Sequence, residues 1–159
     1  MKIIKLTQNK RAVVDNEDFE WLNQYSWCLS GNGKYPVRHA KVAQGLYTIK
    51  RMHREIMDAP DDKHVDHING DTLDNRKSNL RLCTNRENVY NRGKQKNNKS
   101  GYKGVSLHHK KNLKKPWFAQ IRADSRTMCL GLFSTPEEAA LAYNKAAVKY
   151  HGEFARFNN

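Results

Sequence analysis

The stretch that decides the fold is Val65-Asp66-His67-Ile68-Asn69-Gly70-Asp71. It places a carboxylate next to an imidazole in a short segment with apolar flanks, and a turn-forming Asn-Gly pair follows. Asn79 and Asn88 come 13 and 22 residues after Asp66. Hydrolysis of a phosphodiester needs an activated water, a cation on the scissile phosphate and help for the departing oxygen. These four side chains are of the types that supply such chemistry.

Each of the four residue types suits one role. Asp66 can hold a hard divalent cation through oxygen, and Asn88 can offer an amide oxygen to the same cation. His67 can be neutral near pH 7 and so can accept the proton of a water molecule, while Asn79 can position its neighbours. Adjacent residues on a strand point to opposite faces, so Asp66 and His67 share a site only if the strand twists or ends there. The Asn69-Gly70 turn allows that.

The surrounding pattern predicts short mixed elements. A strand at 65–67, a second strand at 80–83 and a helix capped by Thr84 or Asn85 would place Asn88 on the helix. The apolar spacing of residues 48–57 predicts another helix, which ends before Pro60. Nearer the N-terminus, strands are expected at 3–6, 11–15, 27–29 and 35–38, with a short helix over 19–25.

Val65-Asp66-His67, Asn79-Leu80-Arg81 and Asn88 resemble the HNH nuclease family, in the H-N-N variant of phage and intron-encoded homing endonucleases. The resemblance covers roughly residues 47–92 and implies a ββα-metal core at about 62–91. It implies that Asp66 and Asn88 bind one Mg²⁺ or Mn²⁺ ion, that His67 is the general base, and that Asn79 braces the hairpin and orients His67. It also implies 5′-phosphate and 3′-hydroxyl products, often from a single-strand nick.

Some assignments have alternatives. Asn91 competes with Asn88 as the second ligand, and His53 is either a packed histidine or a ligand. Zinc-stabilised members of the family carry paired CxxC motifs, which this sequence lacks, so no structural zinc is expected. The three cysteines, Cys28, Cys83 and Cys129, lie far apart in the sequence.

The charge of the chain is concentrated in its middle. The 159 residues carry 29 Lys+Arg and 16 Asp+Glu, a net charge of +13, and residues 92–126 alone hold 11 basic side chains and one acidic one. A balance this basic predicts nucleic acid as the partner, and the resemblance to HNH nucleases implies that this partner is double-stranded DNA. No apolar run of about 18 residues is present, so no membrane span is expected.

Residues 92–100 contain no apolar side chain and predict a basic linker between domains at 1–91 and 101–159. Such a linker is either disordered or ordered along a DNA backbone. The C-terminal domain shows strands at 102–107, 117–122 and 127–133 and then a helix that begins with a capping box from Thr135 to Glu138 and ends at Gly152. This order predicts a three-stranded antiparallel sheet packed on one helix, with its other face open to a ligand.

Residues 101–158 resemble the plant ethylene-response-factor (APETALA-type) DNA-binding domain, through Gly104-Val105, Trp117, 119–122, 130–133 and 138–143. The resemblance implies that the sheet enters the major groove. The implied DNA-binding residues are Lys103, Trp117, Gln120 and Arg122, with Arg126 as a neighbour, and Lys110, Lys111, Lys114 and Lys115 either grip phosphates or form a solvated loop. Trp117 is a contact or a core residue, whereas Phe118 is expected in the core. Gln120, Ser106 and Cys129 depart from the plant pattern, so the plant target sequence does not transfer.

The sequence therefore predicts an α+β protein with a ββα-metal (HNH) nuclease module followed by a three-stranded antiparallel sheet packed on one helix. The predicted function is site-specific cleavage of DNA by a monomeric, homing-type nicking endonuclease. It would act in the cytoplasm of a bacterial host and be encoded by a phage or mobile element. The alternative is a DNA-binding regulator with an inactive nuclease module. A structure-specific phage nuclease or an RNA-directed protein fits the pattern less well.

Overall fold

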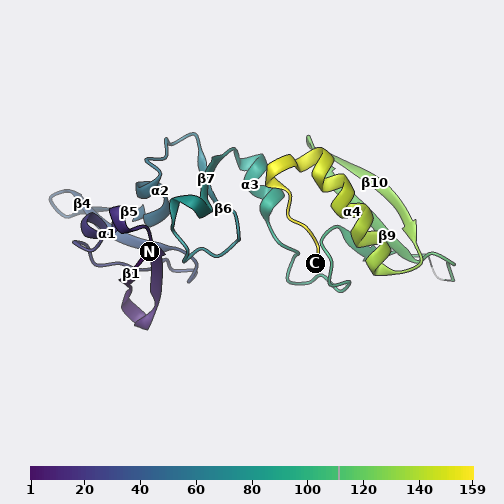
Figure 1. The fold of residues 1–159 in the computed structure, drawn as a ribbon, viewed down its shortest axis with the longest axis horizontal. Helices are drawn as coiled ribbons and strands as arrows, with labels where there is room; N and C mark the ends of the chain where they lie inside the picture. The colour runs from purple at the N-terminus through teal and green to yellow at the C-terminus, as the bar shows by residue number, and fades with distance from the viewer. Residues whose placement is uncertain (111) are drawn as a thin grey trace. The chain divides into compact units, whose positions relative to one another are not determined.

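The computed structural model describes residues 1–110 and 112–159 and divides them into two compact units, Met1–Asn88 and Val89–Asn159. Lys111, one of the lysines predicted to grip phosphates, lies outside the described residues. Short helices and small antiparallel sheets confirm the predicted α+β class (Figure 1). No helix in the described part of the chain is long and apolar enough to cross a membrane.

The first unit begins with a hairpin of β1 (Lys2–Lys5) and β2 (Arg11–Val14), joined by the 3-10 turn η1 (Thr7–Asn9) and followed by α1 (Asn16–Leu22). Ile4, Val14 and Leu22 are fully buried and form one core with residues of the later elements. Trp27 lies in this core, and its indole N–H donates to the Leu22 carbonyl at 2.8 Å. The N-terminal elements therefore belong to the same hydrophobic core as the segment that holds Asp66.

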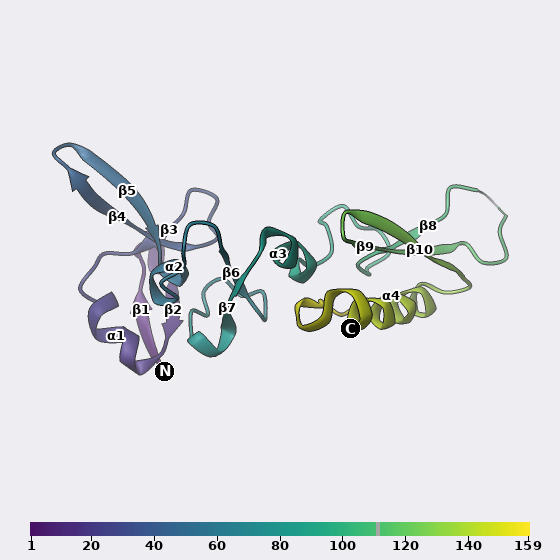
Figure 2. The ribbon, with the colours of Figure 1, turned by 90° about the horizontal axis from the view of Figure 1, so that it is seen from above.

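A three-stranded sheet follows, made of β3 (Cys28–Leu29), β4 (Pro36–Ala43) and β5 (Leu46–Arg51). β4 and β5 form a two-stranded ribbon that extends away from the rest of its unit (Figure 2). The predicted helix at 48–57 was wrong in its first half, because residues 46–51 pair with β4 after a turn at Gly45, whose φ is +74°. Only α2 (Met52–Ile56) is helical.

The last elements of this unit have the order strand, strand, helix. β6 (His64–His67) pairs antiparallel with β7 (Leu80–Cys83), in a register that sets Asp66 opposite Arg81 and His67 opposite Leu80. The 3-10 turn η2 (Lys77–Asn79) leads into β7, and α3 (Asn85–Asn91) follows it. Val65 and Leu80 bury their side chains in the core of the unit, which fixes this hairpin against β1 and β2. The ββα order predicted from the sequence is thus confirmed.

In the second unit, β8 (Val105–Leu107), β9 (Trp117–Ala123) and β10 (Arg126–Phe133) form an antiparallel sheet in the order β10-β9-β8. α4 (Pro136–His151) lies along one face of the sheet and ends in η3 (Gly152–Phe154) (Figure 2). The helix starts as predicted, since the Thr135 hydroxyl accepts from the Glu138 N–H at 3.2 Å.

Small side chains bring the helix close to the sheet. Ala139, Ala146 and Ala147 of α4 are buried in the two clusters that join it to the strands. Gly104 is required here, because its φ is +73° and a Cβ on it would lie 2.3 Å from the Tyr143 ring. No helix of the described part of the second unit lies on the opposite face of the sheet, as Figure 2 shows.

Candidate active site

Asp66 and His67 are consecutive residues of β6, and both are buried. The cross-strand register brings Arg81 to Asp66, whose Oδ2 accepts from Nε at 3.0 Å and from Nη2 at 2.8 Å. A buried carboxylate is stable only with such partners. Arg81 therefore holds Asp66 in a defined position as a charged oxygen donor.

His67 is buried, and this burial lowers its pKa below the usual range although Asn75 and the nearby carboxylates act in the opposite direction. Its Nε2 lies 3.4 Å from Oδ1 of Asn75, a fully buried amide whose own Nδ2 donates to the Thr72 carbonyl. In the tautomer that carries its proton on Nε2, Nδ1 is the basic nitrogen. The ring is then neutral at physiological pH, as a general base must be.

Two further rings surround His67. His53 on α2 meets it edge-on with centroids 5.1 Å apart, and Tyr35 lies 5.0 Å from His53 and 6.1 Å from His67. Burial, and after it the charge of the neighbouring His67, lowers the pKa of His53 to about 3. His53 Nδ1 is buried and has no hydrogen-bond partner among the residues that the structure describes. The structure therefore gives His53 a packed place beside His67.

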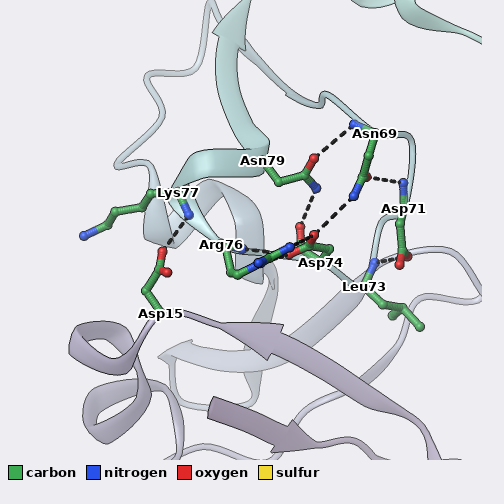
Figure 3. A network of polar contacts seen from close by, with 8 residues as sticks. All are labelled: Asp15, Asn69, Asp71, Leu73, Asp74, Arg76, Lys77 and Asn79. Carbon is green, nitrogen blue, oxygen red and sulfur yellow. Dashed lines mark hydrogen bonds and ion pairs between the residues drawn. The ribbon is translucent and has the colours of Figure 1, made fainter. Parts of the chain in front are cut away.

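The loop between His67 and β7 is held by a polar network (Figure 3). The Asn79 amide closes it from both sides: Oδ1 accepts from the Asn69 N–H at 3.0 Å, and Nδ2 donates to the Asp74 carbonyl at 2.8 Å. The Asn69 side chain in turn donates to Asp74 Oδ2 at 3.1 Å and accepts from the Asp71 N–H at 2.7 Å. These two bonds hold the backbone directly after His67. The role that the resemblance implies for Asn79, bracing the hairpin and orienting His67, stays a prediction.

Asp74 is the centre of this loop. Arg76 binds its carboxylate with both Nε, at 2.7 Å, and Nη2, at 2.6 Å, and so lowers the pKa of Asp74. The N-terminal strands hold the same loop from outside. Val13 N–H donates to the Leu73 carbonyl and the Val13 carbonyl accepts from Asn75 N–H, both at 2.8 Å, and Asp15 accepts from Lys77 N–H at 2.8 Å.

Asn88 lies in the first turn and a half of α3 and is half-buried. The helix start is fixed by a capping box, in which the Glu87 carboxylate accepts from the Thr84 N–H at 2.7 Å and the Thr84 hydroxyl accepts from the Glu87 N–H at 3.3 Å. This fixed start determines the helical position of Asn88. Asn91, the alternative ligand, is buried and belongs to the second unit.

The oxygen donors of this region suit a hard divalent cation. Among the described residues, no group of three or more His, Cys, Asp or Glu side chains could hold a metal ion. Asp66 and Asn88, the predicted metal ligands, carry a carboxylate and an amide oxygen, which are donor types that Mg²⁺ accepts. The thiol of Cys83 lies near Asp66, and burial raises its pKa to about 11, so it stays protonated at neutral pH.

In the second unit the predicted DNA-binding residues fall on different surfaces. Gln120 and Arg122 are exposed on the sheet face away from α4, opposite Cys129 and Thr127 of β10, and Arg126 is exposed at the start of β10. Lys110, Lys114 and Lys115 are exposed in the connection between β8 and β9.

Trp117 and Lys103 are less open. Trp117 is half-buried and packs against the cluster of Val105 and Ala119, whereas Phe118, expected in the core, lies on the other face near His108. The strand alternation explains this exchange. Lys103 is half-buried with its ammonium 2.5 Å from the Tyr90 carbonyl, and burial lowers its pKa to about 8.

Sequence reasoning missed the partners of the two central residues. Arg81 and Asn75 are 15 and 8 residues away from Asp66 and His67, respectively, and they meet them only through the strand register and the loop path. Arg81 belongs to the Asn79-Leu80-Arg81 motif, but only the register between β6 and β7 shows that it pairs with Asp66. The ring contacts of Tyr35 depend on the long-range packing of the unit.

A ββα module with an Asp-His pair on its first strand defines a class of phosphodiester-cleaving proteins, and comparison with known proteins gives the family. Residues 58–90 match the family model described as HNH endonuclease. An uncharacterized HNH endonuclease of Acanthamoeba polyphaga mimivirus is 32% identical over 153 residues, which are 92% of this chain and 74% of that protein. Protein 3.8 of Escherichia phage T7 is 30% identical over 122 residues, 74% of this chain and 98% of that protein. The chain therefore belongs to the HNH endonuclease family, whose substrate is DNA and whose members typically use a divalent metal.

The second unit has a partial match of its own. Two AP2-like ethylene-responsive transcription factors of Arabidopsis thaliana are each 46% identical over 55 residues, which are 33% of this chain and 9% of those proteins. No solved structure gave a significant match.

Proposed function

We propose that this DNA nuclease is a site-specific, homing-type endonuclease that nicks one strand, with residues 1–91 as the nuclease domain and 101–159 as an ethylene-response-factor-type reading domain. The observation that carries the proposal is the buried Asp66-His67 pair on β6, each residue with its own fixed partner. Such order around two buried polar side chains is costly for stability and is typical of a catalytic site.

In this proposal His67 takes the proton of the attacking water. Its neutral ring is oriented by Asn75 through the 3.4 Å contact and by the packed ring of His53. Asn79 keeps the following backbone in place, so the base stays aimed while DNA binds. Asp66 and Asn88 are the residues that would hold one Mg²⁺ or Mn²⁺ ion. When bound, that cation supplies electrostatic stabilisation of charge on the phosphate and the leaving oxygen.

DNA recognition is assigned to the outer face of the β8–β10 sheet. Gln120, Arg122 and Arg126 are exposed there or at its edge, and a sheet of this kind can read base edges from the major groove. The exposed lysines Lys110, Lys114 and Lys115 would contact phosphates. The 46% identity to plant DNA-binding proteins over this segment supports the assignment.

The β4–β5 ribbon is proposed as an additional contact of the nuclease domain. The ribbon extends away from the rest of its unit (Figure 2). Its residues Lys41, Lys50 and Arg51 are exposed. A two-stranded ribbon of this type fits a DNA groove. With one module of each kind, the protein would act as a monomer. It would be encoded by a phage or mobile element and would act in the cytoplasm of the bacterial host.

The experiment is a cleavage assay on supercoiled DNA that carries the sequence flanking the gene, with Mg²⁺ or Mn²⁺. We expect a discrete nick that EDTA and His67→Ala abolish. His64→Ala is the matched control, because His64 lies on the same strand but is exposed, and it should cleave normally. Tight DNA binding without cleavage in any divalent cation would contradict the proposal and favour the regulator with an inactive nuclease module.

A further inference from the structure

The basic segment 92–100 is not a free chain within the second unit. Ser100 Oγ donates to the Val105 carbonyl at 2.8 Å and accepts from the Tyr102 N–H at 3.1 Å. Asn98 donates to the Tyr102 carbonyl at 2.8 Å and accepts from the Gly101 N–H at 2.9 Å. These side-chain to backbone bonds replace the apolar contacts that the segment lacks, so its path is fixed before any ligand arrives.

A groove of about 760 Å³ lies between this segment and strands β8 and β9. This size is in the range of ligand-binding clefts. Its basic lining consists of Arg92, Lys94, Lys99 and Lys103, and none of the described residues that line it is acidic. Ser106 and Gln120 of the open sheet face also line it, so the groove is continuous with the proposed reading surface.

Among the described residues, no carboxylate forms an ion pair with the basic side chains of the groove. The ammonium of Lys94 donates to the Gly101 carbonyl at 2.9 Å, and that of Lys103 donates to the Tyr90 carbonyl. Arg92 and Lys99 are exposed at the groove wall. The apolar side chains of Val105, Leu107 and Trp117 lie among the lining residues. These basic and apolar side chains together fit a linear ligand that carries regularly spaced negative charges with less polar groups between them.

We propose that this groove binds the sugar–phosphate backbone of one DNA strand, with Arg92 and Lys99 on its phosphates, as a second DNA contact beside the open sheet face. The proposal rests on the proposed function in one respect, namely that the second unit carries the DNA. Backbone contacts release counterions and are independent of sequence. The groove therefore raises affinity for any duplex, and the open sheet face supplies the choice of site.

The test uses a matched pair on the same segment. Lys96 is as exposed as Lys99 but does not line the groove. The full chain in EDTA is titrated with a fluorescent duplex of mixed sequence at several KCl concentrations, by anisotropy. The slope of log K against log[KCl] is negative, and each lost phosphate contact reduces its magnitude by about 0.9. We expect Arg92→Gln/Lys99→Gln to reduce the magnitude by about 2 and Lys96→Gln to leave it nearly unchanged.

A second measurement needs no variant. Lysine acetylation of the wild-type protein, followed by mass spectrometry, should show Lys99 protected by the duplex and Lys96 still reactive. Equal slopes for Lys96→Gln and Arg92→Gln/Lys99→Gln, or equal acetylation of Lys96 and Lys99, would overturn the groove and leave only diffuse attraction. Both measurements are made in EDTA, so a failure to cleave DNA, which would refute the proposed function, is recorded separately.

Discussion

Asn79 offers a direct test of how the loop after His67 is held. Its side chain makes two hydrogen bonds, to the Asn69 N–H at 3.0 Å and to the Asp74 carbonyl at 2.8 Å (Figure 3). Asn79→Ala removes both and leaves two backbone groups without their partner. A buried polar group that loses its partner costs about 1–3 kcal/mol. Because the Asn69 N–H is only partly buried, we expect a total loss near 3 kcal/mol in the free energy of unfolding of the first unit.

The loss should be measured by urea unfolding with Trp27, which is buried in the same core as Leu80. A Trp117→Phe background removes the only tryptophan of the second unit from the signal. Ser78→Ala is the control, since Ser78 is the exposed neighbour of Asn79. Surface changes of that kind usually stay within about 0.5 kcal/mol.

Activity should follow the same change. Without Asn79 the backbone at Asn69 is released, and His67 loses the fixed loop that follows it. We expect the single-turnover nicking rate to fall even where the variant is fully folded. The bracing role would be refuted if the free energy of unfolding of Asn79→Ala lies within about 0.5 kcal/mol of the parent value and the variant nicks DNA at the same rate.

Three further predictions concern other parts of the chain. Gly104→Ala should destabilise the second unit by about 2–4 kcal/mol, because a Cβ there would lie 2.3 Å from the Tyr143 ring and the backbone has a φ of +73°. Calorimetry of the full chain measures this, and an unchanged unfolding transition of the second unit would refute it. Asp66→Ala and Asn88→Ala should each abolish cleavage and leave duplex binding in EDTA largely intact; full cleavage by both would exclude them as metal ligands. The pKa of His53 is lowered to about 3 in the folded chain. As the pH falls below about 6.5, the unfolded chain therefore binds a proton at His53 while the folded chain does not. The free energy of unfolding decreases by about 1.4 kcal/mol for each pH unit of this fall. His53→Phe keeps a ring in place and should remove that part of the slope between about pH 4.5 and 6; urea unfolding with the same slope as wild type would show that His53 is not neutral when folded.

Local signals gave the elements that carry the site. The helix starts at Thr84 and Thr135 were predictable because a capping box involves residues only three apart. The strand of Asp66 was predictable from its apolar flanks and the turn that follows. Long-range pairing was not predictable in this way. Whether 46–51 is a strand or a helix depends on β4, and the apolar spacing alone suits both.

The polar partners show the same limit. Arg81 reaches Asp66 because of the register between β6 and β7, and a shift of one residue would send it to the other face. The composition of residues 92–100 predicts a linker because it includes no apolar residue. In the structure, Asn98 and Ser100 nevertheless form hydrogen bonds to the nearby backbone. Composition reports the lack of a hydrophobic core, but it does not report local side-chain to backbone bonding.

The catalytic module cannot be reduced to the ββα segment alone. Val65 and Leu80, one from each strand of the hairpin, are buried in a core whose other members include Ile4, Val14 and Trp27. Removal of the N-terminal strands would expose both side chains to water. The folded state would lose about 25 cal/mol of stabilisation for each Å² of apolar surface exposed. It would also break the two backbone bonds by which Val13 holds the loop at Leu73 and Asn75. Since the Asn75 amide lies 3.4 Å from His67 Nε2, the first strands help to set the geometry of the proposed general base although they carry none of its chemistry.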